Sequence, residues 1–491
     1  MAKDFAALWP LVFPAVGACF LPLASLDREH DTAKWIRGVL YLVTLLALGG
    51  SFFYLADLWH VGGQPSFEAL RMDRLAQFSG IFITVAAAIT VLQAWDHFHQ
   101  EGWVKAETLS LLLFSVTGMM LFTATSNLLL MFLGLELLSL PLYALVGTVR
   151  TRPEASEGAM KYFLTGAVAS SCFLMGTVLL YGLTGTLDLS RAMASSAGSD
   201  PLFLAGAALL LLGFLFKTSA VPFHQWTPDA YQASPHPIAG FMSVATKGAA
   251  FVALLRAFPG ALSLGAAGPK AQQAFAVLAV LTLVLGNLTA LVQTDAKRML
   301  AYSSISHAGY LLLGFVAGTP AAYTGILYYL AIYLAMNLGA FGLFTAYGLV
   351  GEDTSYDALR GLGWKRPLLG LYAAIFMLSL AGIPPFGGFF GKYLIFKELV
   401  GTGHTSLAVL GVLASLVSLA YYLRFLVALF LQAPTEALER RRAEQPAAPA
   451  ALASASLFVA AFIVVMGGLA QGLLIPGFAQ RAIEEGLKLV R

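Results

Sequence analysis

LLLLGFLFKTSAVPFHQWTPDAYQ, residues 209–232, combines an apolar run, a lysine and a proline. Residues 202–216 carry no charged side chain, so they are apolar enough to enter a bilayer as a helix. Lys217 lies too far from the preceding helix end for its side chain to reach water there. Pro222 lacks a backbone donor and clashes with the previous helical turn. The stretch therefore predicts a membrane helix that breaks close to a buried charge.

The composition of the whole chain also indicates a membrane protein. Of 491 residues, 58% are hydrophobic and 11% are charged, whereas soluble domains are about 45–50% apolar and about 25% charged. Backbone groups inside a bilayer have no water to bind, so spans are helices or closed barrels. The apolar runs are too long and continuous for barrel strands, which alternate in polarity. The sequence predicts an all-α polytopic membrane protein without a separate soluble domain.

Hydropathy predicts about 14 transmembrane helices. The first is expected to be a retained helix, because it lacks a small-residue cleavage site and further spans follow it. The predicted spans are 5–25, 36–57, 74–95, 107–124, 127–149, 160–183, 202–232, 236–256, 272–293, 299–317, 321–347, 368–400, 404–430 and 450–474.

Basic residues predict the orientation of these spans. With the N-terminus outside, the cytoplasmic loops receive most of the basic residues, including the pairs Lys297-Arg298 and Lys365-Arg366 and the run 440–442. Both termini then lie on the outer side of the membrane. The net charge of +3 is spread over many loops, which argues against a nucleic-acid partner. The two cysteines form no spaced pair that would suggest a disulfide or metal site.

Five ionisable residues lie within predicted spans: Glu136, Lys161, Lys217, Lys247 and Lys392. A charge near mid-membrane costs about 2.5–3.5 kcal/mol on insertion scales, so each residue is a functional candidate. Glu136 lies deep in the apolar run 132–147, and three of the lysines have apolar sequence on both sides. Lys161 begins its span, where snorkelling to the surface is the alternative explanation. A structural role is the competing interpretation for all five.

A second predicted helix break lies in the twelfth span. Pro384-Pro385 precede Gly387-Gly388 there, and Lys392 follows. Paired breaks at corresponding positions of two repeats are typical of transport sites, and an odd number of helices inverts the second repeat. We expect spans 4–8 and 9–13 to be inverted five-helix repeats with helices 7 and 12 broken. The predicted regions are 1–106 (N-terminal helices), 107–256 and 272–430 (first and second repeats), and 431–491 (cytoplasmic loop, helix 14 and tail).

Three further ionisable residues are weaker candidates. His224 and Asp229 follow the break at Pro222, where they would line an access path or fix the bent backbone. His307 in the tenth span would join a proton path, because histidine titrates near neutral pH. A histidine satisfied within the core is the alternative for His307.

Four ordered segments together resemble a known family: KYFLTGAVASSCFLMGTVLLYGLTGT (161–186), FKTSAVPFHQWTPDAYQASPHPIAGFMSVATKGAAF (216–251), QTDAKRMLAYSSISHAGYLLLG (293–314) and LAGIPPFGGFFGKYLIFKE (380–398). The chain resembles the antiporter-like membrane subunits of respiratory complex I, and among them the subunit N type of NADH-quinone oxidoreductase. Segment 161–186 and Lys392, where subunit M carries a glutamate, favour the N type. The alanine-rich segment 437–456 is longer than this family leads us to expect.

The resemblance implies a proton-translocating subunit with a half-channel in each repeat. Glu136 would tune Lys217, and Lys247 would connect the two halves. Lys392 would exchange protons toward the outside, and Lys161 would mediate between this subunit and its neighbour. Buried lysines suit such a relay, because burial eases deprotonation and an approaching carboxylate opposes it.

The resemblance also implies where cofactors and partners lie. No cofactor is expected in this chain, whereas NADH, FMN, Fe–S clusters and quinone are expected in partner subunits. Expected neighbours are subunits M and K and the lateral helix of subunit L, together with membrane lipid. The expected location is the bacterial inner membrane.

Two other functions remain open from the sequence. One is an Mrp-type Na⁺/H⁺ antiporter subunit, although a sodium site would need more buried carboxylates or unwound carbonyls. The other is a scaffold that binds quinone or lipid without moving protons. That alternative leaves the deep lysines without a purpose. Co-purification with redox subunits, or activity of the isolated chain in proteoliposomes, would distinguish the three.

Overall fold

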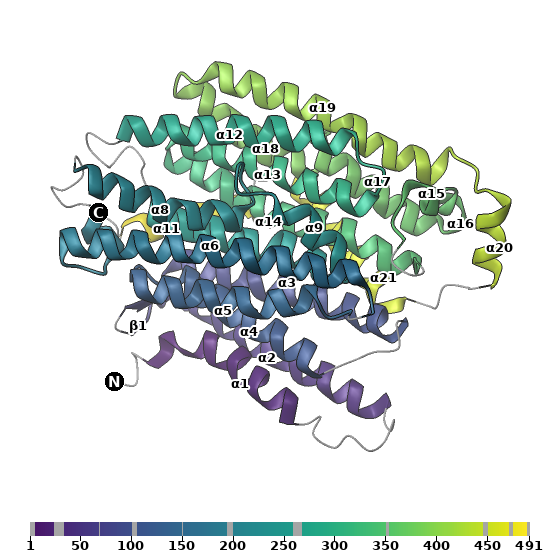
Figure 1. Cartoon of the computed structure of the whole chain (residues 1–491), viewed down its shortest axis with the longest axis horizontal. Helices are drawn as coiled ribbons and strands as arrows, with labels where there is room; N and C mark the ends of the chain where they lie inside the picture. Colours follow the sequence, from purple (N-terminus) through teal and green to yellow (C-terminus); the bar gives the residue numbers. More distant parts are fainter. Residues whose placement is uncertain are drawn as a thin grey trace.

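The computed structural model describes residues 5–23, 34–67, 69–100, 106–149, 151–193, 200–258, 268–349, 353–444, 450–470 and 475–488. Most of them belong to helices that run side by side in one bundle (Figure 1). Among the described residues, 12 helices are long and apolar enough to cross a membrane. Two shorter apolar helices, Trp9–Leu23 and Pro367–Ala381, accompany them. The predicted class, an all-α polytopic membrane protein, is confirmed.

The elements follow one another in three groups. Before the first break they are η1 (Phe5–Ala7), α1 (Trp9–Leu23), α2 (Lys34–Val61), β1 (Ser66–Phe67), β2 (Leu70–Arg71), α3 (Arg74–Gln100), α4 (Ala106–Thr123), α5 (Leu128–Val146), α6 (Pro153–Thr184), α7 (Leu189–Met193) and α8 (Pro201–Thr218). Between the breaks they are α9 (Trp226–Ala233), α10 (His236–Phe241), η3 (Met242–Thr246), α11 (Lys247–Ala257), α12 (Gly268–Leu291), α13 (Ala296–Ala317), α14 (Pro320–Tyr347), α15 (Tyr356–Leu359), α16 (Leu362–Lys365) and α17 (Pro367–Ala381). After the second break they are α18 (Gly387–Gly401), α19 (Thr405–Phe430), α20 (Glu436–Glu444), α21 (Ala451–Leu469) and α22 (Ile475–Lys488).

The first break separates α8 from α9 at the position expected from Pro222. Helix α8 ends at Thr218, and Ser219 adopts the left-handed conformation with φ 61°. The freed N–H of Val221 donates to Oγ1 of Thr282 on α12 at 3.0 Å. A neighbouring helix thus satisfies the unwound backbone, which is a condition for irregular structure at membrane depth.

The second break separates α17 from α18 and contains Pro384-Pro385. Gly382 ends α17 with φ +87°, a conformation that favours glycine. The N–H of Gly388 donates to Oγ of Ser379 at 3.1 Å, which ties the two half-helices together. A Cβ atom on Gly388 would collide with the carbonyl of Ser379, so a larger residue would force the halves apart.

The predicted eighth span, 236–256, is not α-helical throughout. The π-helical segment η3 separates α10 from α11, and Lys247 is the first residue of α11. A π turn widens a helix locally and is frequently found at functional sites. The span itself is present, since 236–257 is one continuous apolar helical segment, and the π turn lies within it.

Close helix packing in the bundle depends on small residues. A Cβ on Gly134 of α5 would lie 2.7 Å from the backbone nitrogen of Phe122 on α4. A Cβ on Gly176 of α6 would lie 2.6 Å from the carbonyl oxygen of Gly206 on α8. These contacts bring helix backbones together, as expected for packing that is not driven by hydrophobic burial.

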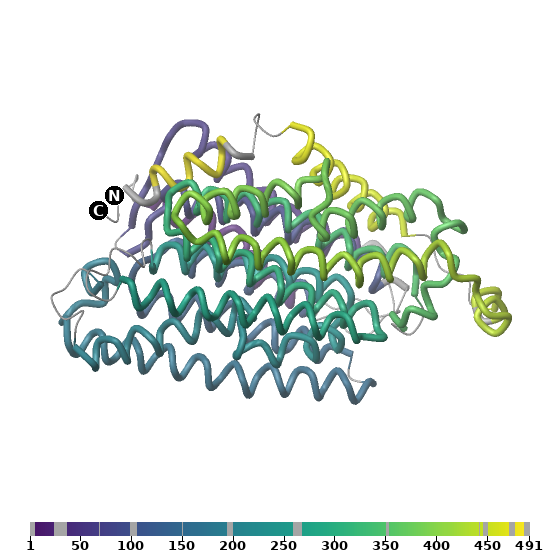
Figure 2. The backbone as a smooth tube through the Cα atoms, turned by 90° about the horizontal axis from the view of Figure 1, so that it is seen from above, coloured from purple at the N-terminus to yellow at the C-terminus, as the bar shows by residue number. Residues whose placement is uncertain are grey.

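The C-terminal segment contains a helix that the sequence interpretation treated as part of a tail. Helices α21 and α22 lie beside the N-terminal helices (Figure 2). Phe478 of α22 packs on Trp59 of α2 with ring centres 3.8 Å apart. Glu485 accepts a hydrogen bond from Nε of Arg74 at 3.0 Å. Helix α22 is thus held against α2 and α3.

Candidate functional site

Lys217 occupies the last turn of α8, immediately before the first break. The residue is only 2% exposed. Its Nζ atom donates a hydrogen bond to the hydroxyl of Tyr162 on α6 at 3.2 Å. The same atom lies 4.9 Å from the ring centre of Tyr162 and 5.3 Å from that of Tyr143 on α5. A hydroxyl and aromatic faces therefore surround this ammonium group.

Glu136 lies on α5, two helical turns before Tyr143 and on the same helix face. Its Oε1 atom is buried and accepts no hydrogen bond from any described residue. No ion pair within 4.0 Å joins Glu136 to Lys217 in the described part of the chain. Glu136 and Lys217, which the sequence predicts to interact, are thus near enough for an electrostatic interaction but are not in direct contact. Two tyrosine rings pack against the lysine instead.

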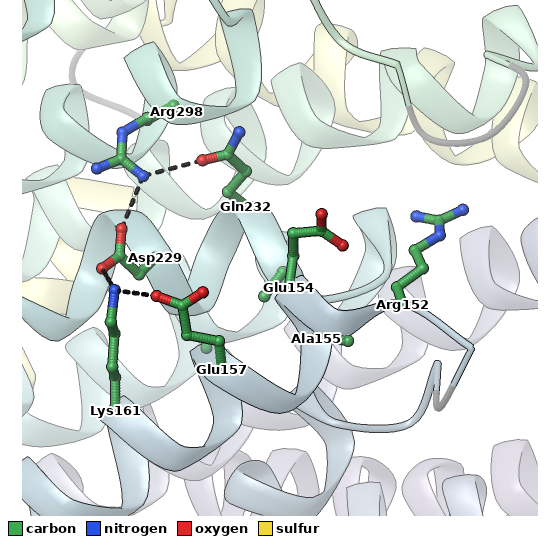
Figure 3. Close-up of a pocket in the computed structure, with 10 residues that line it drawn as sticks. Arg152, Glu154, Ala155, Glu157, Lys161, Asp229, Gln232 and Arg298 are labelled. Carbon is green, nitrogen blue, oxygen red and sulfur yellow. Dashed lines mark hydrogen bonds and ion pairs between the residues drawn. The ribbon is translucent and has the colours of Figure 1, made fainter.

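Lys161 forms an ion-pair network at the surface end of the first break (Figure 3). Its Nζ atom lies 2.8 Å from Oδ2 of Asp229 on α9 and 2.6 Å from Oε1 of Glu157. Arg298 on α13 donates to the other carboxylate oxygen of Asp229 at 2.7 Å. The network borders a pocket of about 460 Å³, which is lined by Arg152, Glu154, Ala155, Glu157, Gly158, Lys161, Asp229, Gln232, Ala233 and Arg298.

The two candidates beyond Pro222 have different surroundings. Asp229 belongs to α9, which lies outside the 12 long apolar helices of the described chain. Burial raises the pKa of Asp229, but hydrogen bonds and charge from Lys161 and Arg298 outweigh it, so the pKa lies below its ordinary value. His224 lies in the break itself, is half-buried, and does not line the pocket. Only Asp229 borders this polar opening.

Lys247 lies at the centre of the bundle, fully buried where η3 meets α11. Its Nζ atom donates to both the carbonyl and the hydroxyl of Ser304 on α13, with 3.0 Å to the hydroxyl. These contacts join α11 directly to α13. Lys247 therefore has two neutral oxygen acceptors from one residue.

His307 follows Ser304 by one turn of α13 and is 1% exposed. Its Nδ1 atom lies 2.5 Å from the hydroxyl of Tyr329 on α14, and its Nε2 atom lies 3.0 Å from that of Tyr422 on α19. The imidazole ring also lies 5.8 Å from the ring of Tyr310. Both nitrogens are thus engaged by phenol groups.

Lys392 is buried on α18, one turn after the second break. Its Nζ atom donates to the carbonyls of Leu380 and Ala381 at 3.1 Å each, at the end of α17. The ammonium group lies 4.5 Å from the ring centre of Tyr310. Tyr310 therefore contacts both Lys392 and His307.

Two basic residues that the sequence interpretation did not place in the interior are buried. Lys297, expected only to report topology, is 1% exposed and donates to the carbonyls of Gln232 and Ser234 beside the end of α9. Arg256 at the end of α11 makes two hydrogen bonds of 2.7 Å with Asp73, just before α3. Each lies close to a predicted span end, so hydropathy alone gives no sign of its burial.

Among the described residues, no three His, Cys, Asp or Glu side chains gather in a way that could hold a metal ion. The candidate lysines and His307 instead form a buried series in chain order: Lys217 beside the first break, Lys247 at the start of α11, His307 on α13 and Lys392 beside the second break. Contacts through Ser304 and Tyr310 link Lys247, His307 and Lys392. Such groups can hold and pass protons.

The fold and this buried series define an antiporter-like membrane protein. Residues 125–418 match the family described as NADH:quinone oxidoreductase/Mrp antiporter, TM. A subunit N of NADH-quinone oxidoreductase from Salinibacter ruber is 41% identical over 475 residues, which cover 94% of this chain and 93% of that relative. The chain belongs to the NADH-quinone oxidoreductase subunit N family, as its motifs predicted.

Solved structures agree with this assignment. A chain of respiratory complex I from Thermus thermophilus, solved with bound aureothin, has a TM-score of 0.80 and 36% identity. The match covers 96% of this chain and 99% of that chain. A chain of the Mrp complex from Dietzia sp. has a TM-score of 0.86 at 21% identity, covering 100% of this chain and 98% of that chain, so it shows a shared fold only. The chain is thus an antiporter-like membrane subunit of the complex I type.

Proposed function

We propose that this subunit moves protons along the buried series of Lys217, Lys247 and Lys392. The observation that carries the proposal is the line of contacts through α13. Lys247 binds Ser304, His307 follows one turn later, and Tyr310 contacts His307 and Lys392. Titratable groups and hydroxyls thus follow one another from Lys247 to Lys392.

The acceptors of the lysines support reversible protonation. Each Nζ atom binds neutral oxygen atoms: a phenol for Lys217, Ser304 for Lys247 and backbone carbonyls for Lys392. An ammonium group without water or a carboxylate releases its proton more readily than one in solution. In the proposal, Glu136 approaches Lys217 when the proton is to be held and withdraws when it is to be released. Bound waters bridge gaps that side chains cannot span.

The proposed proton inlet is the pocket beside Asp229. Lys161 and Asp229 border it, and the next residue of α6, Tyr162, binds Lys217. His224 lies in the break between α8 and α9, where it would adjust the access path. Lys161 would respond to a neighbouring subunit, because its side chain is 47% exposed. Lys392, beside the second break, would pass protons toward the outside.

The repeat organisation is part of the proposal. We count α1 and the broken α17–α18 unit as spans beside the 12 long apolar helices of the described chain, which would give fourteen. Spans from α4 to α11 would form the first repeat (107–256), and spans from α12 to α19 the inverted second (272–430). Helices α1–α3 (1–106) and the segment 431–491 would flank them. The similar placement of α8–α9 and α17–α18 breaks supports this division.

Cofactors and partners follow from the family. We propose that this chain binds none of the redox groups and that NADH, FMN, Fe–S clusters and quinone are handled by partner subunits. Its membrane neighbours would be subunit M, subunit K and the lateral helix of subunit L. In the bacterial inner membrane, both termini would lie on the periplasmic side.

An Mrp-type exchange of sodium for protons is the second candidate. The structural likeness to the Mrp chain concerns the fold, which does not define the ion. A sodium site needs oxygen ligands with negative charge or unwound carbonyls. The central groups here are ammonium and imidazole groups, so protons are favoured.

Replacement of the central lysines tests the proposal in the assembled complex. Lys217→Ala and Lys247→Ala should each abolish most NADH-driven proton pumping in proteoliposomes, with normal assembly. Lys270→Ala removes an exposed lysine at the start of α12 and serves as the matched control. Normal pumping by both central variants would refute the assignment. Pumping that depends on sodium would favour the second candidate.

A further inference from the structure

Two consecutive residues of α6 contact the short helix α9 in different ways. Lys161 forms an ion pair with Asp229 at the surface. Tyr162, which is fully buried, stacks on Trp226, with ring centres 4.2 Å apart and planes at 12°. Near-parallel stacking of two large rings fixes their relative position closely. Helix α9 is therefore held on α6 by an outer charged contact and an inner aromatic contact.

The inner contact continues to the ammonium group of Lys217. The hydroxyl of Tyr162 accepts a hydrogen bond from Nζ of Lys217 at 3.2 Å. Trp226 donates through Nε1 to the carbonyl of Phe216 at 3.2 Å, and Phe216 directly precedes Lys217. Helix α9 thus touches both the backbone next to Lys217 and the tyrosine that binds its side chain.

The outer contact holds α9 from two sides. Oδ2 of Asp229 binds Lys161 on α6, and Oδ1 binds Arg298 on α13 at 2.7 Å. Figure 3 shows the carboxylate of Asp229 between these two cations. Lys297, the neighbour of Arg298, binds the carbonyl of Gln232 near the end of α9 at 3.2 Å. A change in this network would shift α9, and with it the Trp226 ring.

We propose that Tyr162 is a positioning residue for Lys217, and that its stacking on Trp226 makes the place of the ammonium group follow the position of α9. This inference rests on the proposed proton-transfer function and adds a device that controls its first step. With α9 seated, the Tyr162 hydroxyl accepts a hydrogen bond from the ammonium group. With α9 displaced, the Tyr162 ring loses its stacking partner, and Nζ is free to turn toward Lys247.

Other groups near Lys217 do not provide the same link to α9. Tyr143 and Glu136 face the site from α5, and the ring of Phe216 lies 5.2 Å from Nζ on α8 itself. Among these neighbours of Lys217, Tyr162 alone combines a hydrogen bond to Nζ with a stacked contact to α9. Its hydroxyl and its ring therefore have separable roles.

The experiment uses the pH profile of NADH-driven proton pumping by the assembled complex in proteoliposomes. Tyr162→Phe retains the stacked ring but removes the acceptor of the ammonium proton. The alkaline limb of the profile should move to lower pH by roughly 1–2 pH units, the equivalent of one hydrogen bond to a charged group. Tyr181→Phe changes an exposed tyrosine of the same helix and should leave the profile unchanged.

A second variant tests the link to α9. Trp226→Leu removes the stacked ring and should move the alkaline limb in the same direction while Tyr162 is intact. Trp226→Leu also tests the proposal if the Tyr162→Phe complex fails to assemble. Profiles of assembled Tyr162→Phe and Trp226→Leu complexes that superimpose on the wild type would overturn the inference.

Lys217→Ala in the same assay separates the two proposals. If Lys217→Ala abolishes pumping while the Tyr162 and Trp226 variants behave as wild type, only the positioning role is refuted. If Lys217→Ala pumps normally, the proton-transfer function itself is refuted.

Discussion

Lys247 on α11 donates hydrogen bonds to both the backbone carbonyl and the side-chain hydroxyl of Ser304 on α13. Because one residue supplies both acceptors, the ammonium group is fixed next to the helix turn that also carries His307. The helices joined by this contact belong to the two repeats that we propose. Their connection therefore depends on a few buried polar atoms, which mutation can test separately.

Ser304→Ala should reduce proton pumping without abolishing it. The variant removes the hydroxyl, 3.0 Å from Nζ of Lys247, but keeps the carbonyl acceptor. The loss of one hydrogen bond to a charged group is about 1.5–3 kcal/mol, so pumping should fall by roughly tenfold or more. The pumping rate of the assembled complex is the measurement. Ser171→Ala, at an exposed position of α6, is the control; equal rates for the two variants would contradict the prediction.

The ion pairs of Asp229 should stabilise the complex in a pH-dependent way. The pKa of this carboxyl is lowered in the folded chain, although burial alone would raise it, because Lys161 and Arg298 bind the charged form. The contribution of these ion pairs to the free energy of unfolding is fully present above the unfolded-state pKa of Asp229, about 3.9. It disappears as the pH falls through the lower pKa of Asp229 in the folded chain.

Thermal unfolding of wild type and Asp229→Asn measures this effect. The variant should be less stable at neutral pH, and the difference should shrink once the pH falls below about 4. Asp200→Asn, which alters the N-cap of α8 and not this network, is the comparison. If the difference in stability between wild type and Asp229→Asn grows on acidification, the predicted direction of the pH dependence is wrong.

The buried pair of Asp73 and Arg256 should be costly to break. The side chains are 1% and 4% exposed and meet through two 2.7 Å hydrogen bonds. Asp73→Asn leaves a buried guanidinium without its counter-charge, so we expect a loss of about 3–5 kcal/mol and a lower yield of assembled complex. The double variant Asp73→Leu/Arg256→Met removes both charges and should assemble better than Asp73→Asn. A yield as low as that of the single variant would argue against an unpaired charge as the cause.

Helix α22 should detach when its aromatic anchor is removed. Phe478 packs 3.8 Å from Trp59 and 5.4 Å from Phe78, measured between ring centres. Phe478 is partly buried, so Phe478→Ala should weaken docking by up to about 1.5–3 kcal/mol, the value of a fully buried Phe side chain. Limited proteolysis should then cleave the C-terminal segment faster than in the wild type. Gln480→Ala, an exposed position on the same helix, should cleave at the wild-type rate; equal rates for both variants would exclude an anchoring role.

The two helix breaks were predictable because their causes are local. Pro222 and the Pro384-Pro385 pair remove helix hydrogen bonds wherever they occur, and the structure ends α8 and α17 just before them. The π segment 242–246 has no such marker, since its sequence MSVAT is compatible with a regular helix. The helix at 475–488 was also not predicted. It is amphipathic, so its polar face lowers the mean hydropathy by which membrane spans are identified.

The candidate residues were predictable by type but not by partner. Lys217, Lys247 and Lys392 stand out because charge is rare in apolar runs. Tyr162 and Trp226 do not stand out, because aromatic residues are common in membrane helices. Their importance arises from contacts between α6, α8 and α9.

The sequence by itself determined that the chain lies in a membrane, that it is helical, where two helices break and that Lys217, Lys247 and Lys392 are buried. These properties depend on local hydropathy and on the backbone limits of proline and glycine. Only the tertiary structure decided which groups meet: Lys217 with Tyr162, Lys247 with Ser304, and Asp229 with two cations. The reason is physical, because hydrogen bonds and ion pairs act over a few ångströms between helices whose residues are widely separated along the chain.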